Sequence, residues 1–282
     1  MFKFSVGILA LLLALRVFSG TVTTQIREVD VGDGNESVLV FLSNGGVAKL
    51  QAHSDLISAL QMASEKKTLV KVTLNDEREV LSVQSQRKLV QGEIEQHSLA
   101  PRAYSPSTIP TYEKALSIFK GMNRKSNEES QCYNRAHVWS YEMYNDHHVR
   151  AMKIFVFFTK KYIRRYNFEW WFHVSPYVMV NEEGQSVERV MDFKYTRRPL
   201  LMKEWTDVFT SNNAKCKDIE KYTDYEYNRE SSSSEWCMLL RSSAYYYQPL
   251  DLEKLDKNGQ GKDFWVDWEV SNAYREAFSY RH

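Results

Sequence analysis

The sequence predicts an α+β fold in which helices pack on an antiparallel sheet, preceded by a smaller α+β module. Residues 36–83 carry the short apolar runs and turn signals of hairpins around one short helix. A breaker-rich stretch at 97–110 follows and holds three of the six prolines of the chain. Residues 111–282 then alternate helical patterns with runs of strand-forming residues, and no internal repeat is visible.

The composition is that of a folded chain with no excess of basic residues. The 282 residues are 43% hydrophobic and 13% aromatic, which is enough for a substantial core in one large domain or two modest ones. Lys and Arg total 37 against 36 Asp and Glu, so the formal net charge is only +1. Nucleic-acid-binding domains usually show a clear basic excess, and we therefore expect no nucleic-acid partner.

The first module is predicted to consist of two strand pairs and a helix, without a constellation of reactive residues. The elements are a hairpin of Val38–Leu42 and Val47–Leu50 around the turn Asn44-Gly45-Gly46, a helix capped by Ser54 with Leu56, Leu60 and Ala63 on its apolar face, and a pair of Leu69–Leu74 with Glu79–Val83. Its single histidine, His53, is expected to be a surface residue.

The second module, residues 111–282, is predicted to contain three helices and three strands. The helices are expected near Thr111–Met122, from Cys132 toward Tyr144, and over Phe264–Phe278; the strands are expected at Ile154–Phe158, Phe168–Val180 and Ser186–Asp192. The last two strands flank the turn Glu182–Gln185 and form a hairpin.

The first nineteen residues have the pattern of a signal peptide. Lys3 supplies the positive start, Phe4–Leu15 is a short apolar run, and small or modest residues lead to a predicted cleavage after Ser19. A membrane-spanning helix needs about 20 apolar residues, and Arg16 ends this run too early. We therefore expect a secreted or periplasmic protein without a stable membrane anchor.

Three cysteines in an exported chain leave one thiol to explain. Two of them are expected to pair in an oxidising compartment. Cys216 and Cys237 lie in a stretch rich in Ser, Tyr and Lys, which suits a surface loop closed by a bridge. Cys132 is then the unpaired cysteine. The residues around it have to show whether it is a buried structural thiol or a reactive one.

Cys132 is predicted to lie in the first turn of a helix. Ser130 is a suitable N-cap, or Ser126 with Glu129 forms a capping box one turn earlier. Under the first option, the unpaired N–H groups and the macrodipole of the helix favour the thiolate form of a cysteine in that turn. The alternative is a small apolar residue buried on a helix.

His173 and Asp192 favour the reactive interpretation. If the turn Glu182–Gln185 closes a regular hairpin, Asp192 lies opposite Ser175 and diagonal to His173, on one face of the sheet. Diagonal neighbours are roughly 7 Å apart at the backbone, within reach of a carboxylate and an imidazole. A thiol, an imidazole and a carboxylate are the nucleophile, base and orienting group of covalent catalysis.

At these residues the chain resembles the bacterial protein-glutaminases. Cys132-Tyr133-Asn134-Arg135-Ala136-His137 resembles the nucleophile motif of that family, Phe172-His173-Val174-Ser175-Pro176 its histidine motif, and Val190-Met191-Asp192 its aspartate strand. The close likeness covers residues 131–192. One departure is Phe193, which stands where the family usually has proline, and this puts the local turn in question.

The resemblance implies a papain- or transglutaminase-like catalytic core at 111–282 and a prosegment at 20–110, cut in the linker by an activating protease. Cys132 would be the nucleophile, His173 the general base and acid, and Asp192 the group that orients His173. The implied reaction converts glutamine side chains of proteins or peptides to glutamate through a thioester, with release of ammonia and without a cofactor. The alternatives are a cysteine protease or transglutaminase with the same triad, and a secreted binding domain without catalytic activity.

Other residues have weaker claims to function. His137 is more consistent with a structural role, because five residues after Cys132 it points to another face of the helix. His147-His148 lacks the partners of a metal site, so no metal is expected. Trp170 and Trp171 alternate faces beside His173; Trp171 is the tentative substrate-binding residue, although the sequence does not decide between the two.

Overall fold

The computed structural model of the chain describes residues 20–32, 37–86, 105–122, 130–211, 215–229 and 236–278. The chain divides into two compact units, which are Met1–Ser43 with Ala48–Leu89 and Asn44–Val47 with Val90–His282. The expected signal peptide and most of the expected linker lie outside the described residues.

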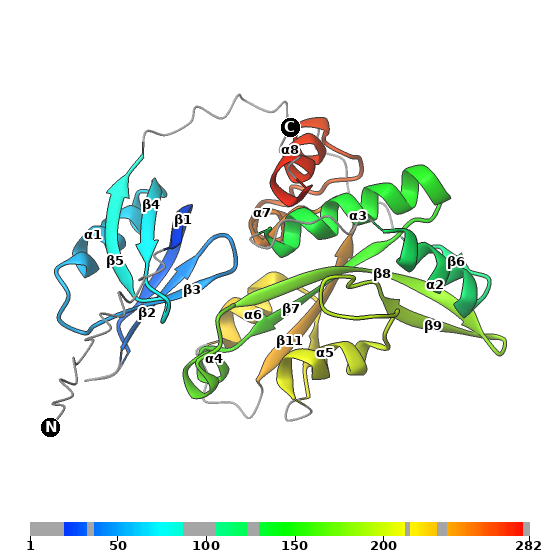
Figure 1. Ribbon diagram of the computed structural model, residues 1–282, viewed down its shortest axis with the longest axis horizontal. Helices are drawn as coiled ribbons and strands as arrows, with labels where there is room; N and C mark the ends of the chain where they lie inside the picture. The colour runs from blue at the N-terminus through cyan, green and yellow to red at the C-terminus, as the bar shows by residue number, and fades with distance from the viewer. Residues whose placement is uncertain are drawn as a thin grey trace, which may run out of the picture. The chain divides into compact units, whose positions relative to one another are not determined.

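The first unit is built on a five-stranded sheet of order β3-β2-β1-β4-β5 (Figure 1). Its elements are β1 (Gly20–Asp30), β2 (Val38–Leu42), β3 (Val47–Leu50), α1 (Leu56–Glu65), β4 (Leu69–Leu74) and β5 (Val80–Ser85). The sequence did not predict β1, which pairs antiparallel with both β2 and β4 and so joins the two predicted strand pairs. Leu60 and Ala63 of α1 are buried as their spacing predicts, whereas the N-cap is Asp55 rather than Ser54.

The second unit contains a six-stranded sheet of order β10-β11-β7-β8-β6, with β9 paired to β8 (Figure 1). Its strands are β6 (Thr108–Ile109), β7 (Met152–Phe158), β8 (Phe172–Glu182), β9 (Gln185–Val190), β10 (Lys217–Ile219) and β11 (Cys237–Ser243). The pairs β11–β7, β7–β8 and β8–β9 are antiparallel, whereas β6–β8 and β10–β11 are parallel.

Helices pack on this sheet and complete the predicted α+β fold. They are α2 (Tyr112–Gly121), α3 (Cys132–His147), α4 (Lys160–Tyr166), α5 (Met202–Thr210), α6 (Tyr222–Asn228), α7 (Pro249–Asn258) and α8 (Asp267–Phe278). Phe119 of α2, Trp139 of α3 and Phe278 of α8 are buried in one core with residues of β8. Tyr225 of α6 stacks on Phe157 of β7, with ring centroids 4.7 Å apart. The predicted class, helices on a mainly antiparallel sheet, is therefore confirmed.

Two strand boundaries near the predicted triad differ from expectation for local reasons. β8 begins four residues after Phe168, because the Phe168 N–H donates to the Ile163 carbonyl at the end of α4. β9 ends before Asp192, because the Asp192 carbonyl accepts the N–H of Thr196 and starts a turn. Both segments are thus used for chain reversals rather than for the sheet.

The predicted disulfide between Cys216 and Cys237 is present, and Cys132 is free. The expectation of a simple surface loop was wrong, because Cys237 is fully buried and is the first residue of β11. Since Cys216 directly precedes β10, the bridge ties the two parallel strands together. Within the part of the chain that the structure describes, no helix has both the length and the apolar character to cross a bilayer.

Candidate active site

The β8–β9 hairpin places a histidine and an aspartate in direct contact. Its register pairs Asn181 with Ser186 and continues without a bulge to the end of β9, as the predicted turn requires. His173 Nε2 lies 2.7 Å from Asp192 Oδ2. Both side chains are buried, with 3% and 1% of their surface exposed. The hairpin therefore brings the two side chains together as expected, although Asp192 lies just beyond the last paired residues, Tyr177 and Val190.

The electrostatics of this pair favour an imidazolium beside a carboxylate. Burial lowers the pKa of His173, but the charge and hydrogen bond of Asp192 and the hydrogen bond and charge of Cys132 raise it to about 9. Burial raises the pKa of Asp192, but the charge and hydrogen bond of His173, a hydrogen bond from Trp205 and the charge of Arg135 bring it below its usual range. The pair therefore carries charge despite its burial.

Cys132 is the first residue of α3 and is partly buried. The N-cap is Gln131 rather than Ser130, and its side chain makes no capping hydrogen bond. The alternative capping box of Ser126 and Glu129 lies outside the described residues. In this position the thiol acts on His173 and raises its pKa, and it belongs to the first helical turn, whose N–H groups have no intrahelical partner.

Arg135, for which the sequence predicted no role, acts on the same group of residues. It is 2% exposed, and its Nη1 donates to the carbonyl and to the Oγ of Ser130, the latter at 2.9 Å. Its guanidinium carbon lies 5.9 Å from the ring centroid of Tyr195. Its charge acts on Asp192, so it balances a buried negative charge and holds the segment just before Cys132.

Aromatic rings enclose His173. The ring centroid of His173 lies 4.8 Å from that of Phe209, 5.2 Å from that of Tyr195, and 5.8 Å from those of Trp170 and Trp205. Trp205 also donates from its indole N–H to Asp192 Oδ2 over 2.8 Å. Sequence reasoning missed this residue because α5 was not predicted.

The two neighbouring tryptophans have opposite environments. Trp170 stacks on His173 and is partly exposed. Trp171 is 1% exposed and packs with Phe157, Phe172 and Tyr225. Trp171, the tentative substrate-binding residue, therefore has its ring in the core, whereas Trp170 contacts His173.

His137 is buried and contacts Lys153. Its Nδ1 lies 2.8 Å from Lys153 Nζ, which also donates to the Tyr246 carbonyl over 2.7 Å. Burial, followed by the charge of Lys153, holds the pKa of His137 well below its usual value. His137 thus links α3 to β7 and does not reach the His173–Asp192 pair, in line with its expected structural role.

The remaining histidines that the structure describes are His53, His147 and His148. His147 ends α3 and His148 is its C-cap, while His53 is exposed. Among the described residues, no group of three or more His, Cys, Asp or Glu side chains is arranged to hold a metal ion.

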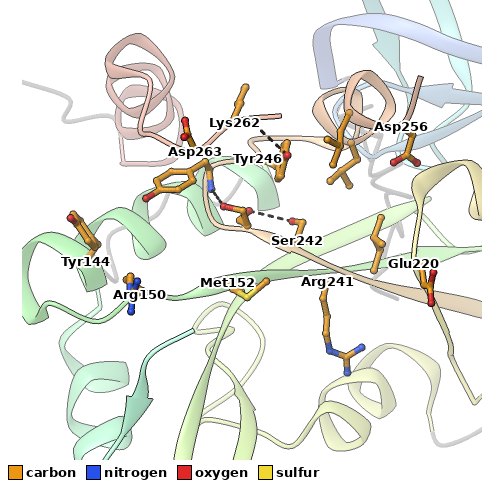
Figure 2. Close-up of a pocket in the computed structure, with 15 residues that line it drawn as sticks. Tyr144, Arg150, Met152, Glu220, Arg241, Ser242, Tyr246, Asp256, Lys262 and Asp263 are labelled. Atoms are coloured by element: carbon orange, nitrogen blue, oxygen red, sulfur yellow. Dashed lines mark hydrogen bonds between the residues drawn. The ribbon is translucent and has the colours of Figure 1, made fainter. Parts of the chain in front are cut away.

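A pocket of about 510 Å³ opens elsewhere in the second unit (Figure 2). Its lining includes Met152, Arg241, Ser242, Tyr246 and Lys262, from β7, β11 and the segments that flank α7. None of Cys132, His173 and Asp192 lines it. The candidate active site formed by these three residues is therefore distinct from this pocket.

Comparisons with known proteins give a match over the segment that carries the site. Residues 119–209 match a family model described as glutaminase. No curated protein matches the chain. A crystal structure of pro-protein-glutaminase is 16% identical, covers 80% of this chain and 83% of its own, and gives a TM-score of 0.49. The NMR structure of protein-glutaminase from Chryseobacterium proteolyticum is 14% identical, covers 55% of this chain and 95% of its own, and gives a TM-score of 0.33.

The matched segment begins before α3 and ends within α5. It therefore includes Cys132, His173 and Asp192, the residues on which the predicted resemblance depends. Over this segment the chain is similar to the glutaminase family, and the resemblance read from its motifs is confirmed.

Proposed function

We propose that this protein is a secreted proenzyme that deamidates glutamine side chains of proteins or peptides through Cys132, His173 and Asp192. One observation carries the proposal: the histidine of a buried, hydrogen-bonded histidine–aspartate pair also interacts with the free cysteine at the start of α3. The glutaminase match over residues 119–209 supports the choice of glutamine as substrate.

The chemistry follows from the two ring nitrogens of His173. Since Nε2 donates to Asp192, Nδ1 is the nitrogen left to exchange a proton with Cys132. The Cys132 thiolate attacks the carboxamide carbon of glutamine, and His173 protonates the departing ammonia as the C–N bond breaks. A thioester remains. Water then gives a proton to His173 and attacks the thioester, which releases glutamate and restores the thiol.

The start of α3 supplies stabilisation for the tetrahedral intermediate. The first N–H groups of a helix have no intrahelical partner, and in α3 these include the N–H of Cys132 itself. Such donors act on an oxyanion that forms beside the nucleophile. Trp170, rather than Trp171, is the tryptophan that we assign to substrate contact, because it is partly exposed and stacks on His173.

The proenzyme part of the proposal is supported by the pairing of Asn44–Val47, which fall within the expected prosegment. Val47 N–H donates to the Glu169 carbonyl over 2.8 Å, and Trp171 N–H donates to the Gly45 carbonyl over 2.9 Å. Both partners lie within four residues of His173, and we infer from this that a segment paired here would restrict access to His173. Export and processing by a protease at 97–110 complete the proposal.

The direct test is ammonia release from a glutamine-containing peptide after limited proteolysis of the linker. We expect the wild-type protein to release ammonia and Cys132→Ala to lose at least about a thousandfold in rate while remaining folded. Mass spectrometry of the same reaction separates the alternatives: chain cleavage indicates a protease, and incorporation of an added amine indicates a transglutaminase. Full activity of Cys132→Ala would reject the mechanism.

A further inference from the structure

Asp192 receives two hydrogen bonds on one oxygen, and only one of them comes from His173. The indole N–H of Trp205 donates to Oδ2 over 2.8 Å, and His173 Nε2 lies 2.7 Å from the same atom. The other oxygen, Oδ1, is buried and accepts no hydrogen bond from the described residues. The orientation of the carboxylate thus depends on two donors that reach it from different elements, β8 and α5.

The helix that carries Trp205 is also held by contacts that do not involve His173. Leu200 forms two backbone hydrogen bonds with Val190, of 2.8 and 3.1 Å, so the chain just before α5 is fixed to the end of β9. At the other end of the helix, Tyr162 donates from its hydroxyl to the Phe209 carbonyl over 2.9 Å. Trp205 is itself fully buried. The indole is therefore a rigid donor.

We propose that Trp205 is a positioning residue of the reaction, which fixes the Asp192 carboxylate and tunes the basicity of His173. The inference rests on the proposed function for its kinetic consequences, but its structural content concerns only the His173–Asp192 pair. An aspartate with a single partner can rotate about its terminal torsion, whereas a second donor from another element restricts that rotation. Proton exchange through His173 needs that orientation in every turnover.

The second donor also weakens the negative charge that His173 faces. A hydrogen bond from a neutral N–H stabilises a carboxylate, and it lowers the pKa of Asp192. Without this bond the carboxylate would hold the imidazolium proton more tightly, so the pKa of His173 should rise. The other charged or titratable groups that act on the pair are Cys132 and Arg135 on α3 and Tyr195 in the segment after β9. A substitution at Trp205 leaves all three of these residues in the chain.

The test replaces the donor but keeps an aromatic ring, with Trp205→Phe. The control is Trp139→Phe, which makes the same change at another buried tryptophan, in the core of α3. In the linker-nicked protein we expect Trp205→Phe to lower kcat about 10- to 100-fold with KM within about twofold. We expect histidine NMR titration to show a higher pKa for His173. Trp139→Phe should lose stability but leave kcat and this pKa unchanged.

A second measurement uses the wild-type protein, so it does not depend on whether a variant folds. The indole N–H signal of Trp205 in the wild-type protein should shift as His173 titrates near pH 9, while that of Trp139 should not. A Trp205→Phe protein that is only less stable, with unchanged kcat and unchanged His173 pKa, would overturn the proposal. A Trp205 indole N–H signal that does not shift as His173 titrates would also overturn it. If the wild-type protein releases no ammonia, the proposed function fails, and the two NMR measurements still decide the role of Trp205.

Discussion

At the scale of single residues, the proposed mechanism depends on the protonation of His173. Its pKa of about 9 means that the imidazolium persists through neutral pH, although the ring is buried. Deamidation by this mechanism needs His173 as an acid when ammonia departs. We therefore expect the rate to fall as pH rises through about 9, because the acid is then lost.

The contributions of Asp192 and Cys132 to the pKa of His173 can be separated. Asp192 and Cys132 both raise the pKa of His173, and Asp192 contributes more. We expect Cys132→Ala to lower the pKa of His173 from about 9, and Asp192→Asn to lower it further. Histidine NMR titrations of the three proteins measure this order directly. An unchanged value in Cys132→Ala would mean that the thiol does not interact with the imidazole.

Some residues of the site could be predicted from the sequence, and others could not. Cys132, His173 and Asp192 are marked by an odd cysteine and a hairpin, both of which are local patterns. Arg135 lies in the nucleophile motif, but its contact with Tyr195 depends on a turn whose course the sequence does not reveal. Trp205 depends on where α5 packs, and that is decided by long-range contacts rather than by any spacing.

At the scale of elements, hairpins were the most predictable parts of the fold. A short turn fixes the register of a hairpin. Once Glu182–Gln185 is assumed to close a regular hairpin, the residue pairs between β8 and β9, beginning with Asn181 and Ser186, follow from it. β1 and the short helices α4, α6 and α7 were not predicted. Their patterns are too short or too polar to stand out, and packing against the sheet stabilises them.

The contact between α3 and β7 should make stability depend on pH. Burial lowers the pKa of Lys153 from 10.5 to about 7 in the folded protein. Between these two values the unfolded chain binds a proton that the folded protein does not, so stability should rise with pH. One proton gives a slope of at most about 1.4 kcal/mol per pH unit. The charged groups that act on Lys153 are Glu269, Asp251 and Lys262.

Urea unfolding at pH 7, 8 and 9 tests this coupling. The wild-type protein should gain stability relative to Lys153→Met as pH rises, since only the wild type carries the depressed group. Lys254→Met is the matched control, because Lys254 is exposed on α7 and its removal should leave the pH dependence as it is. Parallel pH profiles for wild type and Lys153→Met would refute the role of Lys153.

The disulfide makes a separate contribution between elements. Closing a loop of about 20 residues is worth about 3 kcal/mol in the chain-entropy description. We expect the double variant Cys216→Ala, Cys237→Ala to lose stability of this order, because the parallel pair β10–β11 loses its covalent tie. Thermal unfolding measures the loss. Deamidation at low temperature should survive, since neither cysteine belongs to the catalytic group.

At the scale of the whole molecule, the chain separates a part without reactive groups from a part that holds all three catalytic candidates. A tethered prosegment has a high effective concentration at its binding site, so even a weak interface can block the site. We expect protein nicked between His97 and Pro110 to deamidate a glutamine peptide much faster than uncut protein. Equal rates before and after nicking would show that residues 20–110 are not an inhibitory prosegment.

The turn at Gly45 allows a sharper form of this test without a protease. Gly45 has a φ of +95°, and a Cβ there would lie 3.0 Å from Cε1 of Phe172. Gly45→Ala should therefore weaken the pairing of Asn44–Val47 with Glu169 and Trp171, and raise the activity of the uncut protein toward that of the nicked form. Gly259→Ala is the control, because Gly259 also has a positive φ, of +66°, but nothing lies within 4 Å of the added atom. An uncut Gly45→Ala protein that stays as inactive as the Gly259→Ala control would show that this turn does not restrain the enzyme.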